Sequence, residues 1–230
     1  MTPNDVFRIL QKIGADGLHH ANTVTTSCSF LENGALLSRG YIEAHSLKQT
    51  PQASDAIDKK YGIWNDVFVD HVDIHHRGGR SKGANQYGPV LFIFALDLLL
   101  HLPPGTNVRV TRSNPWNWTD NQKGEDRWYL TPESLEQDIH RGDFDKMLVI
   151  TTPDSKVDFP NQEADIALDD PKRTLSNGDD AYIAAEKRLR AAAAKGGVRV
   201  TIAPHVCQVG CKCIAKYGAF DPRYFDTRFS

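Results

Sequence analysis

Residues 18–39 read LHHANTVTTSCSFLENGALLSR, and this stretch indicates the order of elements most clearly. The short segment 17–22 predicts a strand. Thr25 or Thr26 can cap the start of a following helix, whose middle carries adjacent apolar residues. Gly34 comes directly after that helix and is typical of a helix C-terminus. We therefore expect a strand, a short capped helix and a turn within these residues.

This order of elements is expected to bring His20 and Arg39 toward one pocket. A histidine can hydrogen-bond ribose hydroxyls, and an arginine can bind a pyrophosphate through two parallel hydrogen bonds. The amides at the start of a helix add a weaker anion site. The pattern therefore suits an anionic dinucleotide. The residue types alone favour the alternative, a surface histidine and a solvated arginine.

Apolar periodicity predicts further elements on both sides of this stretch. Helices are expected over residues 4–13, 132–140 and 181–195, and strands over 90–96, 146–152, 163–168 and 198–203. Residues 103–123 are interpreted as irregular. Helices gather early and strands later, and the sequence has neither the alternation of a doubly wound fold nor a G-x-G-x-x-G motif or P-loop. The sequence thus predicts one α+β domain over residues 1–230.

The composition is that of an ordinary globular domain. Of 230 residues, 40% are hydrophobic and 24% are charged, which suits one domain with a substantial core. With 27 Lys and Arg against 29 Asp and Glu, the net charge of −2 gives no bulk argument for a nucleic-acid partner. No apolar run reaches the roughly 18 residues of a membrane helix, and residues 1–8 lack a signal pattern. We expect a cytoplasmic protein that does not insert into a membrane.

The stretch from His20 to Arg39 resembles the opening motif of the DarT group of ADP-ribosyltransferases. In that family a histidine on the first strand is followed by a short helix and then by Gly-Gly-Leu-Leu-Ser-Arg. The spacing from Arg39 back to His20 agrees with this motif without a gap. This chain has Gly34-Ala35 in place of the two glycines, and Asn22 where the family usually has threonine.

The resemblance implies an NAD-dependent ADP-ribosyltransferase, a glycosyltransferase of the pentosyl type. Its fold would be α+β, with split twisted sheets, flanking helices and an NAD cleft between the sheets. NAD would be the co-substrate. The residues that the resemblance assigns to NAD binding are His20, Asn22, Ser38 and Arg39.

The resemblance also implies two catalytic groups. Family members place a glutamate at the start of a late strand after a Gln-containing turn, and segment 159–168, FPNQEADIAL, offers Glu163. A carboxylate there would stabilise the oxocarbenium-like ribose that forms as nicotinamide leaves. The alternative for Glu163 is a surface residue of an edge strand. A basic residue that helps to remove the acceptor proton would correspond to Lys59 or Lys60, with Lys60 as the candidate, although the family has arginine and exposed lysines are commonly just solvated.

The family modifies bases in nucleic acid, often as a toxin with a paired antitoxin protein. DNA or RNA is therefore the leading acceptor by analogy, and a toxin or phage-defence effector the leading role. Segment 75–83, HHRGGRSKG, is basic, and Trp116 and Trp118 lie in another loop. Cations and exposed aromatic rings suit a single-stranded nucleic acid, whereas a solvated loop and two core tryptophans are the alternative. The candidate phosphate contacts are Arg77, Arg80 and Lys82.

The late cysteines leave a metal site open. His205, Cys207, Cys211 and Cys213 are residue types that zinc sites use. Only the Cys207–Cys211 pair has the usual spacing, so reduced and partly buried cysteines are the plainer interpretation. Two rival functions follow. One is the same transfer to a protein acceptor, and the other is a non-enzymatic, zinc-bearing nucleic-acid-binding module centred on these residues.

Overall fold

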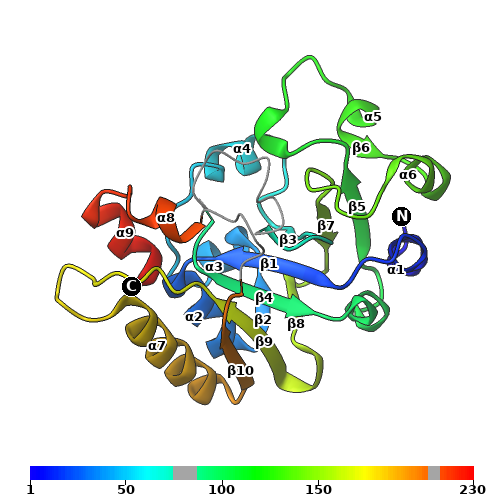
Figure 1. Cartoon of the computed structure of the whole chain (residues 1–230). Helices are drawn as coiled ribbons and strands as arrows, with labels where there is room; N and C mark the ends of the chain where they lie inside the picture. Colours follow the sequence, from blue (N-terminus) through cyan, green and yellow to red (C-terminus); the bar gives the residue numbers. More distant parts are fainter. Residues whose placement is uncertain (75–86, 207–212) are drawn as a thin grey trace.

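The computed structural model describes residues 1–74, 87–206 and 213–230. The described residues form three β-sheets with helices packed around them (Figure 1). The predicted mixture of helices and sheets is confirmed. In these residues no helix is long and apolar enough to cross a membrane.

The first sheet has the strand order β1-β4-β9-β10. Its strands are β1 (Leu18–Asn22), β4 (Val90–Phe94), β9 (Glu163–Leu168) and β10 (Arg199–Pro204). β1 and β9 each run antiparallel to β4, whereas β9 and β10 are parallel and are connected through helix α7 (Ala181–Gly196). All four strands and α7 match predicted segments, with their ends shifted by a residue or two.

The second sheet has the order β3-β7-β5-β6, with every neighbouring pair antiparallel. Its strands are β3 (Val67–Val69), β5 (Asn107–Thr111), β6 (Trp128–Tyr129) and β7 (Leu148–Thr151). A third, two-stranded sheet pairs β2 (Ala35–Leu37) with β8 (Lys156–Asp158). Strand β5 shows that the irregular interpretation of residues 103–123 was wrong in part. Val108 and Val110 are fully buried and alternate with more exposed residues, which is a strand pattern that the nearby glycine and prolines masked.

Helices cover the sheets on several sides (Figure 1). The α-helices besides α7 are α1 (Pro3–Lys12), α2 (Val24–Asn33), α3 (Arg39–Ala44), α4 (Asp55–Lys60), α5 (Gly124–Arg127), α6 (Pro132–Asp138), α8 (Cys213–Tyr217) and α9 (Pro222–Phe229). The 3-10 helices that lie wholly within the described residues are η2 (Leu96–His101), η3 (Pro115–Asn117) and η4 (Pro160–Gln162). Helices α1 and α6 confirm the predictions, whereas the short helices α3 and α4 were not predicted.

Helix α2 begins one turn earlier than its sequence suggested. Its N-cap residue is Thr23 rather than Thr25 or Thr26, and the Thr23 hydroxyl donates to Thr50 (2.8 Å) instead of capping the helix backbone. Gly34 ends the helix with a φ of 62°, as predicted. A Cβ at this position would also lie 2.5 Å from Oε1 of Gln162. Both the left-handed backbone and the close approach favour glycine here.

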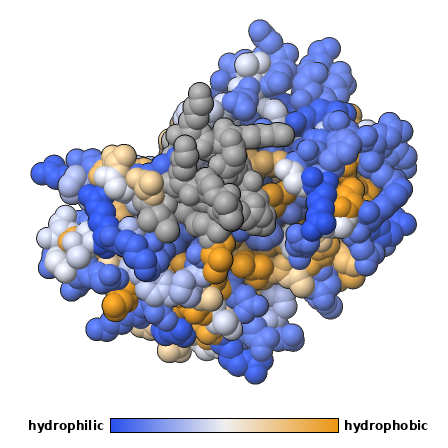
Figure 2. Space-filling view, in the orientation of Figure 1, coloured by the Kyte–Doolittle hydropathy of each residue, from blue (hydrophilic) through white to orange (hydrophobic). Residues whose placement is uncertain are grey.

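The main hydrophobic core includes residues of both four-stranded sheets, and one part of it lies on a face of the first sheet. Phe92 of β4 packs against Phe30 and Phe159, with ring centroids 5.9 and 5.7 Å apart. On β9, Ile166 is buried toward this core while Glu163 is exposed, in the alternation expected of a strand. Figure 2 shows hydrophobic residues gathered along the middle of one side of the molecule, surrounded by hydrophilic ones.

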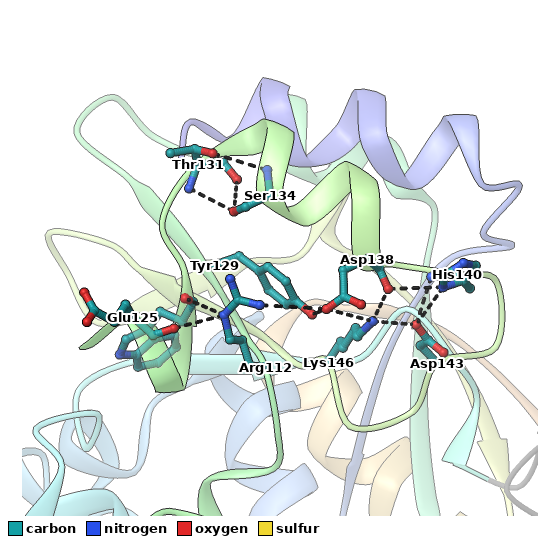
Figure 3. Close-up of polar contacts among 10 residues, drawn as sticks. Arg112, Glu125, Tyr129, Thr131, Ser134, Asp138, His140, Asp143 and Lys146 are labelled. Carbon is teal, nitrogen blue, oxygen red and sulfur yellow. Dashed lines mark hydrogen bonds and ion pairs between the residues drawn. The ribbon is translucent and has the colours of Figure 1, made fainter. Parts of the chain in front are cut away.

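A network of ion pairs and hydrogen bonds connects residues 138–146 to the second sheet (Figure 3). We call it the Lys146 network; its members are Arg112, Tyr129, Asp138, His140, Asp143 and Lys146. Nζ of Lys146 donates to Oδ2 of Asp143 (2.8 Å) and lies 3.7 Å from Oδ2 of Asp138. The Tyr129 hydroxyl donates to Asp138, and burial together with this bond raises the pKa of the phenol. Each charged side chain of the network has a partner of opposite charge or a hydrogen bond.

The two four-stranded sheets meet at an isolated backbone bridge between β1 and the residue after β3. The His19 N–H donates to the Asp70 carbonyl (2.7 Å), and the Asp70 N–H donates to the His19 carbonyl (2.8 Å). The pairing does not continue from this bridge. The imidazole of His20 instead contacts the Phe68 carbonyl at 2.6 Å. The strands thus diverge from the bridge, and the space between them is lined by side chains of both sheets.

A candidate ligand-binding cleft

A cleft lies where the two sheets diverge. It has about 820 Å³ of empty space, counted with its open mouth. The lining residues come from β1, α2, β2, α3, α4, β3 and η3 and from the loops between them. Its polar lining residues are His19, His20, Asn22, Arg39, Gln52, Ser54, Asp58, Asp66, Asp70, Tyr87 and Asn114, and its apolar ones include Phe30, Phe68, Pro115, Trp116 and Met147.

His20 is held as a neutral hydrogen-bonding group. Because the Phe68 carbonyl can only accept, Nδ1 of His20 carries the proton, and Nε2 is left as an acceptor 3.2 Å from Nδ2 of Asn22. Burial lowers the pKa of His20 to about 4, and the positive charge of Arg39 adds to this effect. His20 therefore stays uncharged at neutral pH.

Asn22 is the last residue of β1 and is only 3% exposed. Its Oδ1 accepts from the Thr23 N–H (2.9 Å) and from Nε2 of Gln52 (3.3 Å). These contacts orient the Asn22 amide toward His20. The two residues therefore form a fixed pair of neutral polar groups in the cleft wall, as their shared face on β1 predicts.

Arg39 is the first residue of α3 and is 8% exposed. One terminal nitrogen, Nη2, donates to both carboxylate oxygens of Asp55 (2.7 Å each) and to the Thr50 carbonyl (3.0 Å). Nε and Nη1 are buried and have no partner among the described residues. A buried donor without a partner costs about 1–3 kcal/mol, and more when it is charged. Arg39 thus retains donor capacity for an anionic group.

Two carboxylates in the lining have different surroundings. Asp66 is 4% exposed, and its Oδ2 forms an ion pair with Nη2 of Arg109 (2.6 Å). Asp58 is 8% exposed, and burial raises its pKa to about 7, assisted by the nearby charge of Asp55. Asp58 is therefore partly protonated at neutral pH, in contrast to an ordinary aspartate.

The structure does not bring Glu163 to this cleft. Residues paired across neighbouring strands share a face, and His20, Phe92 and Ile166 form such a row. Glu163 lies three residues before Ile166 on β9 and therefore points to the opposite face. Its side chain is 52% exposed and forms an ion pair with Arg199. This position fits the surface-residue alternative, and the catalytic assignment of Glu163 stays a prediction without support from the geometry.

The predicted lysines also lie outside the lining. Lys60 is exposed, with Nζ 2.6 Å from Oδ1 of Asp120. Lys59 donates to Glu43 (2.9 Å) and lies over the Trp64 ring. Of these three neighbouring residues of α4, Asp58 lines the cleft. The side chains of Lys59 and Lys60 leave the helix in other directions.

Ser38 supports the site from outside the lining. It is 1% exposed, and its hydroxyl accepts from the Tyr41 N–H (3.0 Å) as the cap of α3. The structure therefore gives the Ser38 side chain a capping role that fixes the start of the helix carrying Arg39. The expected direct contact of Ser38 with NAD stays a prediction.

The two tryptophans of the predicted loop differ from each other. Trp116 is 57% exposed and lines the cleft at its outer end, which suits the binding interpretation. Trp118 is 6% exposed, with its ring centroid 5.4 Å from that of Tyr61, which suits the core interpretation. Arg77, Arg80 and Lys82 lie outside the described residues.

The predicted metal-ligand group is described only in part. His205 is buried, with Nε2 3.0 Å from Oδ2 of Asp73 and Nδ1 3.9 Å from Oδ1 of Asp169. Cys207 and Cys211 lie outside the described residues, and Cys213 begins α8. Within residues 1–74, 87–206 and 213–230, no group of three or more His, Cys, Asp or Glu side chains is arranged to hold a metal ion.

Sequence reasoning did not identify Gln52, Asp58 or Asp66 as lining residues. Gln52 lies in a loop, and Asp58 lies in a short helix of mostly charged residues that looks like a solvated surface. A signal was present for Asp58, because Asp55 and Asp58 are three residues apart and so share one face of a helix. Neither a protein-family model nor a curated protein sequence matches this chain.

Proposed function

We propose that this chain is an NAD-dependent ADP-ribosyltransferase that binds NAD, its co-substrate, in the cleft between the sheets and transfers ADP-ribose to a base of DNA or RNA. Arg39 would bind the pyrophosphate, and His20 and Asn22 would bind the ribose and nicotinamide end. We also propose that the chain has the split-sheet fold of this enzyme class. It would act in the cytoplasm as a toxin or defence effector that an antitoxin protein controls.

The observation that carries the proposal is the state of the Arg39 guanidinium. Asp55 and Thr50 use a single nitrogen, and Nε and Nη1 have no partner among the described residues. Each N–H group of a guanidinium can donate a charge-assisted hydrogen bond to a phosphate oxygen. Because Cδ separates Nε–H from Nη1–H, the two donors would bond to different oxygens of an NAD pyrophosphate rather than form one parallel pair.

The neighbouring groups support the same ligand. His20 and Asn22 are neutral, so they can hydrogen-bond hydroxyl and amide groups without attracting a second anion. The lining also includes apolar side chains such as Phe30, Phe68 and Met147, which suit the flat rings of a dinucleotide.

The exposed Trp116 supports a base as the acceptor. It belongs to η3 at the outer end of the cleft, next to Asn114. An aromatic face there can stack on a planar base that approaches bound NAD, and such stacking contributes about 1–3 kcal/mol per base. An acceptor on a protein would not need a ring of this kind.

Two measurements test the proposal. Calorimetry of the whole chain with NAD should give a binding heat that is lost in Arg39→Ala. Incubation with NAD labelled in its adenosine part and with separate pools of DNA, RNA and protein should label nucleic acid. Label on protein alone would favour the protein-acceptor rival. Absence of NAD binding together with tightly bound zinc would favour the non-enzymatic module.

A further inference from the structure

Asp58 differs from Asp55 and Asp66 in how its carboxyl group is satisfied. Asp55 is bound by Arg39, and Asp66 is bound by Arg109. Asp58 is 8% exposed and forms no ion pair with any described residue; the Ser54 side chain hydrogen-bonds to it. A buried carboxylate is normally paired, because an isolated buried charge is costly. An exception that faces a cleft is typical of a functional group.

Several titratable or charged groups surround Asp58. Asp55 lies one turn earlier on α4, and Arg39 on α3 is close enough to interact electrostatically. The neutral His20 on β1 and the carboxyl groups of Asp66 and Asp70 line the same cleft. Lys59 and Lys60 point away from this face. Asp58 thus sits beside the cation assigned to the pyrophosphate, within the same enclosed space.

We propose that Asp58 is a catalytic residue that accepts the proton of the acceptor group as ADP-ribose is transferred. The inference rests on the proposed function. In the step, the bond between the ribose carbon and the nicotinamide nitrogen breaks, and its electron pair neutralises the pyridinium of the leaving nicotinamide. A nitrogen or oxygen of the acceptor bonds to the ribose carbon, and its proton moves to the Asp58 carboxylate.

The acid–base properties of the cleft favour Asp58 over the other candidates. Burial, with Asp55 as the second cause, raises the pKa of Asp58 to about 7, so the base form is available near neutral pH and is stronger than an ordinary carboxylate. The pKa of His20 is lowered to about 4, which makes its imidazole a weak base. A lysine such as Lys60 would first have to lose its own proton, and its ion pair with Asp120 raises its pKa further.

The test is the pH dependence of single-turnover transfer from labelled NAD, from about pH 5 to about pH 9. For the wild type, the rate should rise with pH and level off above an apparent pKa near 7, as Asp58 ionises. Asp58→Asn keeps the shape but cannot accept the proton, so its rate should fall about 100-fold or more and lose this rise. Asp58→Glu should restore part of the transfer rate and part of its rise with pH.

The matched control is Asp120→Asn, which removes an exposed carboxylate next to α4. Its rate and pH profile should equal those of the wild type. NAD affinity, measured by calorimetry, should be nearly unchanged in Asp58→Asn, because the residue acts on the acceptor proton rather than on the pyrophosphate. Thermal melts show whether each variant is folded.

Three outcomes would overturn the role of Asp58. One is an Asp58→Asn rate close to wild type, and another is an Asp58→Asn profile that keeps the wild-type rise. The third is a wild-type rate that does not change across neutral pH, which decides the matter even if the variant fails to fold. Each of these three outcomes is compatible with NAD-dependent transfer by the wild type, so the proposed function would stand. If the wild type neither binds NAD nor transfers label, the proposed function fails and the role of Asp58 falls with it.

Discussion

The cleft and the Lys146 network are both clusters of charged side chains next to the second sheet, but they differ in how those charges are satisfied. In the network, Lys146 contacts Asp138 and Asp143, and the carboxylate of Asp138 also accepts from Tyr129. In the cleft, Arg39 keeps two buried donors without a described partner. Asp58 is buried there without an ion pair among the described residues.

The difference separates groups that stabilise the fold from groups that are available to a ligand. A network whose charges are already paired gains nothing by binding another ion, and breaking it exposes unpaired partners. A buried group with unused hydrogen-bonding capacity lowers stability until a ligand supplies the missing partner. Removing a residue from either cluster should therefore affect different properties of the protein.

The largest effect is expected for NAD affinity in Arg39→Ala. Loss of the guanidinium removes two charge-assisted hydrogen bonds, so the Kd should rise about 100-fold, or about 3 kcal/mol. Arg39→Lys should recover little, because a single ammonium cannot place donors at both the Nε and the Nη1 positions. Titration calorimetry measures both. An unchanged Kd in Arg39→Ala would remove Arg39 from the site and show that its unpaired donors are only a structural defect.

The second-largest effect is expected for the folding stability of Lys146→Ala, which removes a member of the Lys146 network. The Lys146 side chain is 14% exposed, and Lys146→Ala leaves Asp143 and Asp138 close together without their cation. The free energy of unfolding, measured in urea, should fall by about 2 kcal/mol. NAD affinity should not change. Lys172→Ala, which breaks an exposed pair with Asp170, is the control and should cost less than about 1 kcal/mol.

A smaller effect of opposite sign is expected for the stability of Asp58→Asn. The pKa of Asp58 is about 7 in the folded protein against an ordinary 3.8, so between these values the folded state holds a proton that the unfolded state has lost. The stability of the wild type relative to the variant therefore falls as pH rises through this interval. At about pH 8, Asp58→Asn should be more stable than wild type, and near pH 4 the advantage should vanish. An advantage that does not depend on pH would contradict the raised pKa.

The smallest effect is expected for Glu163→Gln. The residue is on the face opposite His20 and pairs with Arg199 at the surface, so transfer should continue near the wild-type rate. The resemblance to a known family predicts the reverse, a nearly inactive variant. A labelling assay on this variant, run beside Asp58→Asn, decides between the two carboxylates.

The strands of the first sheet could be predicted because their signals are local. Segment 163–168 alternates and follows a turn, and the helix before segment 198–203 ends at a pair of glycines. The face on which Glu163 lies is not a local property. It depends on the register of β9 against β4 and β10, which spacing along the chain does not encode.

The candidate site was predictable only in part for the same reason. His20, Asn22 and Arg39 lie within one short stretch, and the structure brings them together. Asp58, Asp66 and Trp116 reach the cleft from three separate segments, so their meeting depends on tertiary packing. Asp58 and Asp66 were also hard to recognise in the sequence. Asp58 lies in a short charged helix and Asp66 directly before a strand, and both patterns are common on protein surfaces.

The backbone bridge between His19 and Asp70 has a consequence for how the protein responds to a ligand. Among the described residues it is the place where the two four-stranded sheets exchange backbone hydrogen bonds, and both cleft walls extend from it. A molecule that contacts His20 on one wall and Asp66 on the other adds further connections between the sheets. Occupancy of the cleft should therefore slow the exchange of the His19 and Asp70 amide hydrogens with solvent, even though neither amide touches the ligand.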